Sequence, residues 1–448
     1  MSIYKTFEHF LSNIQVRNAD KISYRYQQIT KAMNRRYRNT ENETSNCLQV
    51  GSYGRWSAIH GISDLDMIYE IPGSEFERID NLEGNKQSHF LQEVKRAILD
   101  RYPSTDIRAD GQVVSCTFSD QLTVELIPAF YDSADKSHKY GDTNSGGSWR
   151  LCYPRKELSA TQVMNDDTGG SYRRVCRMLR AWRNKHGAPM SGILLDTVVY
   201  AFFKEHPGYV NVSYSNYPRL LLDVFTYLAN APEKETWTAP GSSSPVSTTG
   251  KFQRKAKKAA KHCHDATLEA DNLKKQIRIW RDLFGSTFPK HSDVVVTASS
   301  SVSVAMESRL AEASRGYRDT EQFIEDRFPL HIRYEMELEC HTDKNGAQSR
   351  GFLKSLASQF SWLVPGYGLT FEMVATTVPQ PYELYWKVKN VGPIAEQQDC
   401  IRGDIRQSYG RNWIEERTSF AGEHYVECYA VKDGKVVARE QIVVPITA

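Results

Sequence analysis

The hydrophobic pattern of this chain changes its period near residue 329, and that switch divides the protein. From 330 to 340, in LHIRYEMELEC, apolar residues alternate with polar or charged ones, and YELYWKVKN (382–390) alternates similarly. A two-residue period is typical of a strand with one buried and one solvated face. Residues 424–440 predict a hairpin, because Asp433-Gly434 supplies the positive φ angles of a tight turn. Residues 329–448 therefore predict an all-β module, built as a sandwich.

Before the switch, helical and strand patterns mix. Apolar residues recur every three or four positions over 20–38, and 171–284 is largely helical by the same criterion. Short apolar runs predict strands at 47–50 and 64–72 and a pair of strands within 112–130, turning at Ser119-Asp120-Gln121. The fold class is therefore α+β, with an additional β domain.

The length of 448 residues exceeds that of one ordinary domain, so two or three are expected. We predict a mixed-sheet core with a helical lobe over 1–288, a linker and connecting helix over 289–328, and the β module over 329–448. Within the helical part, 238–250 is predicted to be a loop because it is rich in Ser, Thr, Gly and Pro.

Charge and apolar content exclude some classes of protein. The 57 basic and 54 acidic residues leave a net charge of +3, too little for strong nucleic-acid binding by charge alone. The most apolar stretch, 192–203, contains Asp196 and is too short to span a membrane, so it predicts a buried helix. Eight scattered cysteines and an N-terminus without an apolar signal segment predict a cytoplasmic protein with reduced thiols.

Two aspartates give the strongest chemical signal. Asp64 and Asp66 lie two apart on a predicted strand, so both side chains share one face, about 6.5–7 Å apart along the backbone. Carboxylates this close repel one another unless a cation lies between them, and oxygen ligands suit Mg²⁺, or Mn²⁺ in its place. Glu125 would complete a two-metal site if its strand pairs beside that of the aspartates.

An Asp-x-Asp pair alone is weak evidence, since surface strands carry such pairs by chance. Gly51-Ser52 strengthens it: after a short strand, a glycine turn presents backbone amides and a hydroxyl to a phosphate. Taken alone, Gly51-Ser52 is also explained by a plain turn. A Gly-Ser turn followed by an Asp-x-Asp pair is much less frequent by chance.

These residues resemble a family signature. GSYGRWSAIHGISDLD (51–66) is similar to the signature of bacterial nucleotidyltransferases related to cyclic GMP-AMP synthase and oligoadenylate synthetase: Gly-Ser, a hydroxyl residue at Ser57, and Ser-Asp-x-Asp from Ser63. The third family carboxylate lies in a strand ending in proline, matched by 124–128, with Glu125 in place of the more familiar Asp. The resemblance implies a polymerase β-like mixed sheet with a helical lobe.

The same resemblance implies a site for the donor triphosphate. The family uses a basic residue on one helix and a hydroxyl at the start of the next, and Arg180 and Ser191 are the matching positions. Arg183 or Lys185 could take the place of Arg180, whose other reading is a solvated helix face. Lysines along 251–261 could line a nucleotide groove, although such runs are more often solvated.

The β module resembles a second family, the adenylyl/guanylyl and SMODS C-terminal sensor domains. The matching elements are Trp386 to Gly392, Arg402-Gly403, Glu416 to Thr418 and Gly422 to Cys428. Its polar residues would either bind a nucleotide, with Arg and Trp stacking on it, or form a network that holds the sandwich together. Those residues are Arg402, Arg406, Arg411, Trp413, Glu416, His424 and Glu427.

Together, the resemblances imply a nucleotidyltransferase that joins NTPs (ATP, GTP or others) into a cyclic or linear oligonucleotide messenger. Asp64, Asp66 and Glu125 would hold the metal, and Gly51, Ser52, Arg180 and Ser191 would bind the donor phosphates. The family implies CBASS-type antiphage signalling through a separate effector, with no membrane partner. Two alternatives stay open: nucleotidyl transfer to RNA or protein, and a catalytically silent nucleotide-binding sensor.

Overall fold

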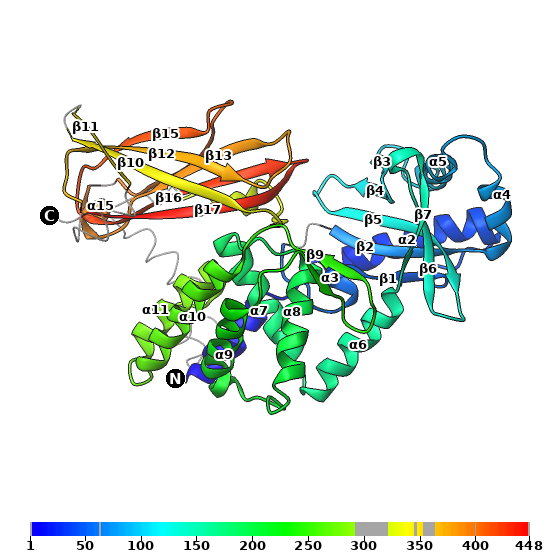
Figure 1. The fold of residues 1–448 in the computed structure, drawn as a ribbon, viewed down its shortest axis with the longest axis horizontal. Coiled ribbons are helices and arrows are strands. Elements are labelled where there is room, and N and C mark those ends of the chain that lie inside the picture. Colours follow the sequence, from blue (N-terminus) through cyan, green and yellow to red (C-terminus); the bar gives the residue numbers. More distant parts are fainter. Residues whose placement is uncertain are drawn as a thin grey trace, which may run out of the picture.

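The computed structural model describes residues 2–61, 64–291, 321–344, 347–352, 363–398 and 400–446. Figure 1 shows a lobe built on a mixed sheet (the sheet lobe), a helical lobe beside it, and a β domain lying over the helical lobe. Ser63 of the predicted signature lies outside the described residues. So does most of the predicted connecting helix, since the described end of the linker contains only a 3-10 turn at Ile324–Asp326.

The sheet lobe is built on a seven-stranded mixed sheet with the strand order β1-β2-β5-β4-β3, and β6 and β7 extend from β5. Helices α2 and α5 pack on the sheet through a core that includes Ile22, Leu65, Phe90 and Leu126. The elements are α2 (Ala19–Arg38), β1 (Cys47–Gln49), α3 (Gly51–Gly54), β2 (Asp64–Ile71), α4 (Phe76–Asp80), α5 (Lys86–Leu99), β3 (Asp106–Asp110), β4 (Val113–Thr117), β5 (Thr123–Asp132), β6 (Ser137–Asp142) and β7 (Ser148–Cys152).

The predicted strands of this lobe are confirmed. The strand predicted at 64–72 is β2, which ends before Pro72, and the pair predicted within 112–130 is β4 and β5. The pairing on which Glu125 depended also forms: β2 and β5 run parallel, with Asp66 opposite Glu125.

The helical lobe buries large aromatic side chains, among them Phe7, Trp182, Phe225 and Trp280. Its helices are α1 (Ile3–Asn13), α6 (Pro154–Asp167), α7 (Ser171–His186), α8 (Gly192–Glu205), α9 (Tyr217–Asn230), α10 (Gln253–Leu268) and α11 (Leu273–Phe284). The prediction of a plain loop at 238–250 is wrong in part. Strands β8 (Thr236–Thr238) and β9 (Pro245–Ser247) pair there, because Trp237 and Val246 bury their side chains in the lobe.

The C-terminal domain has two antiparallel four-stranded sheets, ordered β11-β10-β12-β15 and β14-β13-β16-β17. Side chains from both sheets, such as Leu338, Phe371, Trp386 and Cys428, fill the space between them, which confirms the predicted sandwich. The strands are β10 (Met336–Lys344), β11 (Ala347–Phe352), β12 (Tyr367–Thr376), β13 (Glu383–Lys389), β14 (Arg402–Gln407), β15 (Trp413–Arg417), β16 (Gly422–Lys432) and β17 (Lys435–Ile446), with a short helix α15 (Pro393–Gln397).

Two details of this domain refine the predictions. The hairpin of β16 and β17 turns at Asp433 and Gly434 with φ angles of 51° and 71°, as expected. The strand predicted at 330–340, however, begins only at Met336. The preceding residues run beside the start of β17 instead: the amides of His331 and Arg333 donate to the carbonyls of Val436 and Val437 at 2.8 and 2.9 Å.

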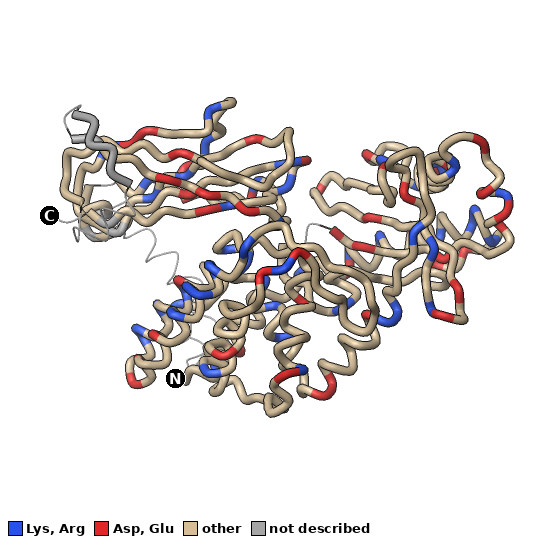
Figure 2. Tube along the Cα trace, viewed as in Figure 1, with Lys and Arg blue, Asp and Glu red and all other residues tan. Residues whose placement is uncertain are grey.

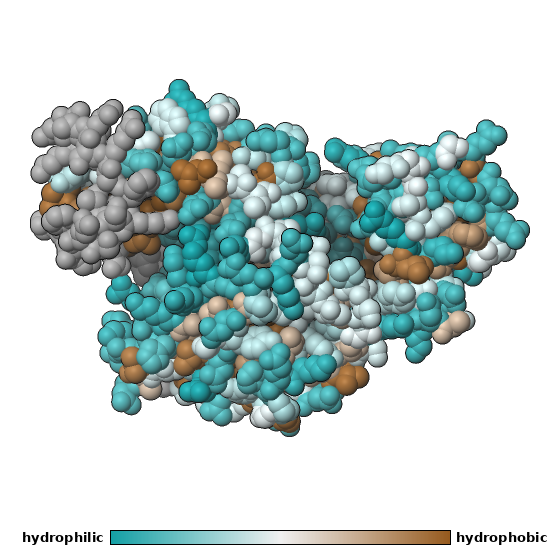
Figure 3. Space-filling model, viewed as in Figure 1, coloured by the Kyte–Doolittle hydropathy of each residue, from teal (hydrophilic) through white to brown (hydrophobic). Residues whose placement is uncertain are grey.

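Apolar residues are concentrated inside the lobes rather than along one exposed face. Among the described residues, no helix is both long and apolar enough to cross a membrane. In Figure 3 the visible face is largely hydrophilic, and its hydrophobic residues are scattered rather than gathered in one patch. The predicted buried helix at 192–203 is confirmed as part of α8, which packs in the helical core.

Candidate active site

Three carboxylates converge at the start of two parallel strands. Asp64 and Asp66 lie at the first and third positions of β2, and Glu125 lies opposite Asp66 on β5. One ligand oxygen from each lies within 4.8 Å of those of the other two. The structure therefore brings together the three residues that sequence pairing predicted. Their role as metal ligands stays a prediction.

The electrostatics of this cluster favour a bound cation. Burial raises the pKa of Asp66, and the neighbouring carboxylates of Asp64 and Glu125 raise it further. Burial and Asp64 likewise raise the pKa of Glu125. A divalent ion between the three would offset both the repulsion and the lost hydration. Three carboxylate oxygens are a donor set that suits Mg²⁺.

Gly51 lies against one of these carboxylates. Its φ is +62°, and a Cβ atom at this position would come within 1.7 Å of the Oδ2 atom of Asp66. The amide of Val50 donates to the carbonyl of Asp66 at 2.9 Å, which fixes this approach. Glycine is therefore required both by the backbone conformation and by the space beside Asp66.

We expect Gly51→Ala to reduce catalytic efficiency by about 100-fold, because displacing a catalytic group by about 1 Å has an effect of this size. Product formation and the melting temperature would both be measured. Gly84→Ala is the matched control, since Gly84 has a φ of +68° and nothing within 4 Å of an added Cβ. Equal effects of the two variants would show that the contact with Asp66 does not require glycine.

A buried ionic network connects the two lobes behind the site. Asp196 of α8 is fully buried and accepts from Arg55 at 2.8 Å and from Ser57 at 2.9 Å. The same carboxylate accepts two bonds from Arg180, at 2.6 and 2.9 Å. Sequence reasoning did not identify this network, although a charged residue inside an apolar helix was a signal for it.

The position of Arg180 does not favour the predicted phosphate contact. Its guanidinium is 3% exposed and is committed to Asp196. Arg183, the predicted alternative one turn further along α7, is also buried, and its guanidinium bonds to Asn184 and to the carbonyl of Met190. Burial lowers the pKa of Arg183 to about 9, and Asp64 is among the charges that act on it.

The two serines predicted to bind phosphate both hold local structure, Ser191 through its hydroxyl and Ser52 through its backbone carbonyl. Ser191 caps α8, with its Oγ atom accepting from the amide of Leu194 at 3.2 Å, so its hydroxyl proton can still be donated. The Ser52 carbonyl accepts from the amides of Ser57 and Ala58 at 2.9 and 3.1 Å, which holds the turn after α3. Phosphate binding by Ser52 and Ser191 stays a prediction.

Residues from the C-terminal domain also reach the carboxylates. The Nδ1 atom of His331 lies 3.3 Å from Oδ2 of Asp64. The Nζ atom of Lys435 lies 3.9 Å from the same oxygen and 3.7 Å from Oε1 of Glu125. Charged positions at the end of the β16–β17 hairpin approach the catalytic sheet in Figure 2. No local sequence pattern indicated this contact, because it depends on how the domains pack.

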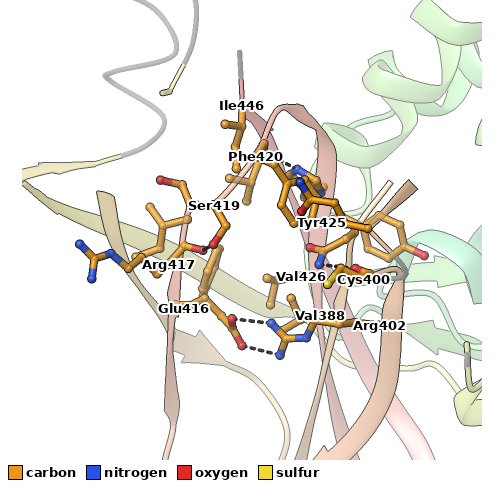
Figure 4. Close-up of a pocket in the computed structure, with 17 residues that line it drawn as sticks. Val388, Cys400, Arg402, Glu416, Arg417, Ser419, Phe420, Tyr425, Val426 and Ile446 are labelled. Atoms are coloured by element: carbon orange, nitrogen blue, oxygen red, sulfur yellow. Dashed lines mark hydrogen bonds and ion pairs between the residues drawn. The ribbon is translucent and has the colours of Figure 1, made fainter. Parts of the chain in front are cut away.

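A cavity lies within the C-terminal domain, away from the carboxylate cluster, and has a volume of about 320 Å³ (Figure 4). Arg402 and Glu416 lie on its wall and form a bidentate ion pair with distances of 2.7 and 2.8 Å. Phe420 and Tyr425 add aromatic surface. Of the predicted sensor residues, Arg402, Glu416 and His424 line this cavity. Glu427 instead is 2% exposed and pairs with Arg439, which agrees with the alternative of a polar network that holds the sandwich together.

Two family matches cover most of the chain. Residues 1–165 match the Second Messenger Oligonucleotide or Dinucleotide Synthetase (SMODS) domain, and residues 318–447 match the Adenylyl/Guanylyl and SMODS C-terminal sensor domain. A protein of Bacillus cereus (strain VD146), described as a probable cyclic nucleotide synthase, is 20% identical over 276 residues, which are 54% of this chain and 82% of the relative.

Solved structures of similar fold include CdnC of Escherichia coli MS115-1 in its complex with HORMA-deltaN. It is 16% identical, with 64% of this chain and 98% of that one covered and a TM-score of 0.47. The di-nucleotide cyclase DncV of Vibrio cholerae is 12% identical, with 65% and 89% covered and a TM-score of 0.46. Because these TM-scores lie below 0.5, the assignment to a family rests on the two domain matches.

Proposed function

This chain is a nucleotidyltransferase of the Second Messenger Oligonucleotide or Dinucleotide Synthetase family with a C-terminal sensor domain, and we propose that it joins NTPs into a cyclic or linear oligonucleotide messenger. The observation that carries the proposal is the cluster of Asp64, Asp66 and Glu125, held beside Gly51 on two parallel strands. Such a cluster suits metal-dependent transfer of a nucleotidyl group.

In the proposed reaction, a ribose hydroxyl of one nucleotide attacks the α-phosphorus of an NTP. The new bond joins the hydroxyl oxygen to phosphorus, the bond to the β-phosphate breaks, pyrophosphate leaves, and the hydroxyl proton passes to water. Bound Mg²⁺ would supply activation of the hydroxyl and neutralise charge on the leaving group. Asp64, Asp66 and Glu125 would hold it, and the turn at Gly51 would keep Asp66 in place.

A wider role is proposed from the family resemblance. We propose that the product activates a separate effector in antiphage defence, which is the role the family resemblance implies. The cavity between Arg402, Glu416 and the aromatic side chains of the C-terminal domain would take a nucleotide-like ligand. The match of residues 1–165 to the Second Messenger Oligonucleotide or Dinucleotide Synthetase domain supports nucleotide substrates.

The direct test is incubation of the purified chain with the four NTPs and Mg²⁺, followed by mass spectrometry. We expect pyrophosphate release together with a small product that resists phosphatase, and no product when EDTA is present. Label transferred to added RNA or to the protein itself would support the alternative acceptors instead. Absence of any product with Mg²⁺ or Mn²⁺ would overturn the proposal and favour a silent nucleotide sensor.

A further inference from the structure

The arrangement of the domains assigns a second role to the C-terminal domain. We propose that Lys435 completes the active site by binding the triphosphate of the donor NTP. The inference rests on the proposed function and names a substrate-binding residue that lies outside the nucleotidyltransferase core. What carries it is the placement of Lys435 beside both Asp64 and Glu125.

Lys435 lies at the edge of the carboxylate cluster rather than inside it. Its Nζ atom is 3.7 Å from Glu125 and 3.9 Å from Asp64, beyond the range of about 2.7–3.2 Å for a direct hydrogen bond. A lysine that replaced the metal ion would close on these oxygens. Instead, the three ligand oxygens stay within 4.8 Å of one another, which is close enough for them to share an ion. Lys435 is therefore placed to contact a phosphate group that is bound to that ion.

An NTP needs such a cation. Its triphosphate carries about four negative charges, and the metal site holds three carboxylates of its own, so two divalent ions leave net negative charge to be offset. Lysine binds phosphate oxygens as a point charge. Arg180 does not serve this purpose, because its guanidinium is bonded to Asp196. The C-terminal domain therefore adds a cation to the core.

Contacts across the domain interface hold the hairpin that carries Lys435 in a fixed position. Lys255 of α10 donates to the carbonyls of His186 and Gly187 at 2.6 and 3.1 Å and pairs with Glu440 of β17 at 3.0 Å. Arg439 of β17 donates to the carbonyl of Asn184 at 3.1 Å. Gly187 lies so close that an added Cβ would come within 2.0 Å of the carbonyl of Arg439. The hairpin is thus fastened to the end of α7, the helix that carries Arg183.

The test measures anion binding directly, apart from turnover. Inorganic tripolyphosphate with Mg²⁺ would be titrated calorimetrically into the full-length chain and into Lys435→Ala. We expect this variant to raise the Kd about 10-fold. Lys432→Ala is the control, because Lys432 lies on the same hairpin across the turn and bonds to the carbonyl of Pro381. Its Kd should stay within twofold of the wild type.

Synthesis from NTPs would be followed in parallel, with the melting temperature as a check of folding. A higher KM for the donor NTP in Lys435→Ala would support the inference. Unchanged tripolyphosphate binding would overturn it, as would an equal loss in Lys432→Ala. Tighter binding or faster synthesis in Lys435→Ala would also overturn it, since Lys435 would then block the site. If the wild type makes no product, the proposed function fails, but the binding titration still decides this inference.

Discussion

Replacing both Asp64 and Asp66 by asparagine is expected to lower the rate of product formation by at least about 1,000-fold. Asparagine has nearly the shape of aspartate but lacks its charge, so the double variant keeps one carboxylate, Glu125, of the three that converge. Removing one electrostatic contact to a transition state costs about 10²–10³-fold. Removing two metal ligands should cost at least as much. Release of pyrophosphate, measured with saturating NTP and Mg²⁺, gives the rate.

The thermal stability of the same double variant, in contrast to its activity, should not fall. Because the folded-state pKa of Asp66 lies above its usual value, ionisation of this carboxyl opposes folding of the metal-free chain at neutral pH. Neutral amides at both positions would remove the repulsion, so the metal-free double variant should melt no lower than the wild type. Mg²⁺ should raise the melting temperature of the wild type alone.

Asp100→Asn is the control, since Asp100 is exposed at the end of α5. It should leave both activity and the response to Mg²⁺ unchanged. Product formation by the double variant within tenfold of the wild type would refute the assignment of Asp64 and Asp66 as metal ligands.

The parts of the site that sequence predicted are those fixed by short-range rules. Alternation along a strand places Asp64 and Asp66 on one face, and Pro72 ends that strand as expected. The turn at 119–121 lets β4 and β5 pair, which sets Glu125 beside Asp66. In the C-terminal domain the same rules gave the alternating strands and the turn at Asp433 and Gly434.

The parts that sequence did not predict depend on contacts between distant segments. Arg180 has the spacing of a solvated helical residue, and only its partner Asp196 on the next helix draws it inside. Lys255 belongs to a basic run expected to be solvated or to line a groove, yet it is 6% exposed in the domain interface. The approach of Lys435 to Asp64 joins residues far apart in the chain, so no local pattern could show it.

The second large effect concerns the buried network. We expect Asp196→Ala to lower the free energy of unfolding by about 3–5 kcal/mol, because removing one member of a buried ionic cluster leaves its partners uncompensated. Asp196 is fully buried and pairs with both Arg55 and Arg180, so two buried guanidiniums would lose their partner. Urea unfolding of the full-length chain measures the loss. Asp223→Ala is the control: Asp223 also pairs with an arginine, Arg219, but at the surface, where pairs contribute about 0–1 kcal/mol.

A pH series separates the charge of Asp196 from its packing. The two guanidiniums hold the pKa of Asp196 well below its usual range in the folded chain, despite burial. A carboxyl whose pKa is lowered on folding contributes stability above its unfolded pKa, about 3.9, and loses that contribution as pH falls toward the folded value. The free energy of unfolding of the wild type should therefore exceed that of Asp196→Asn by the full amount at pH 7. This difference should shrink below about pH 4. A difference that stays constant down to about pH 3 would mean that the network acts through hydrogen-bond geometry and packing rather than through charge.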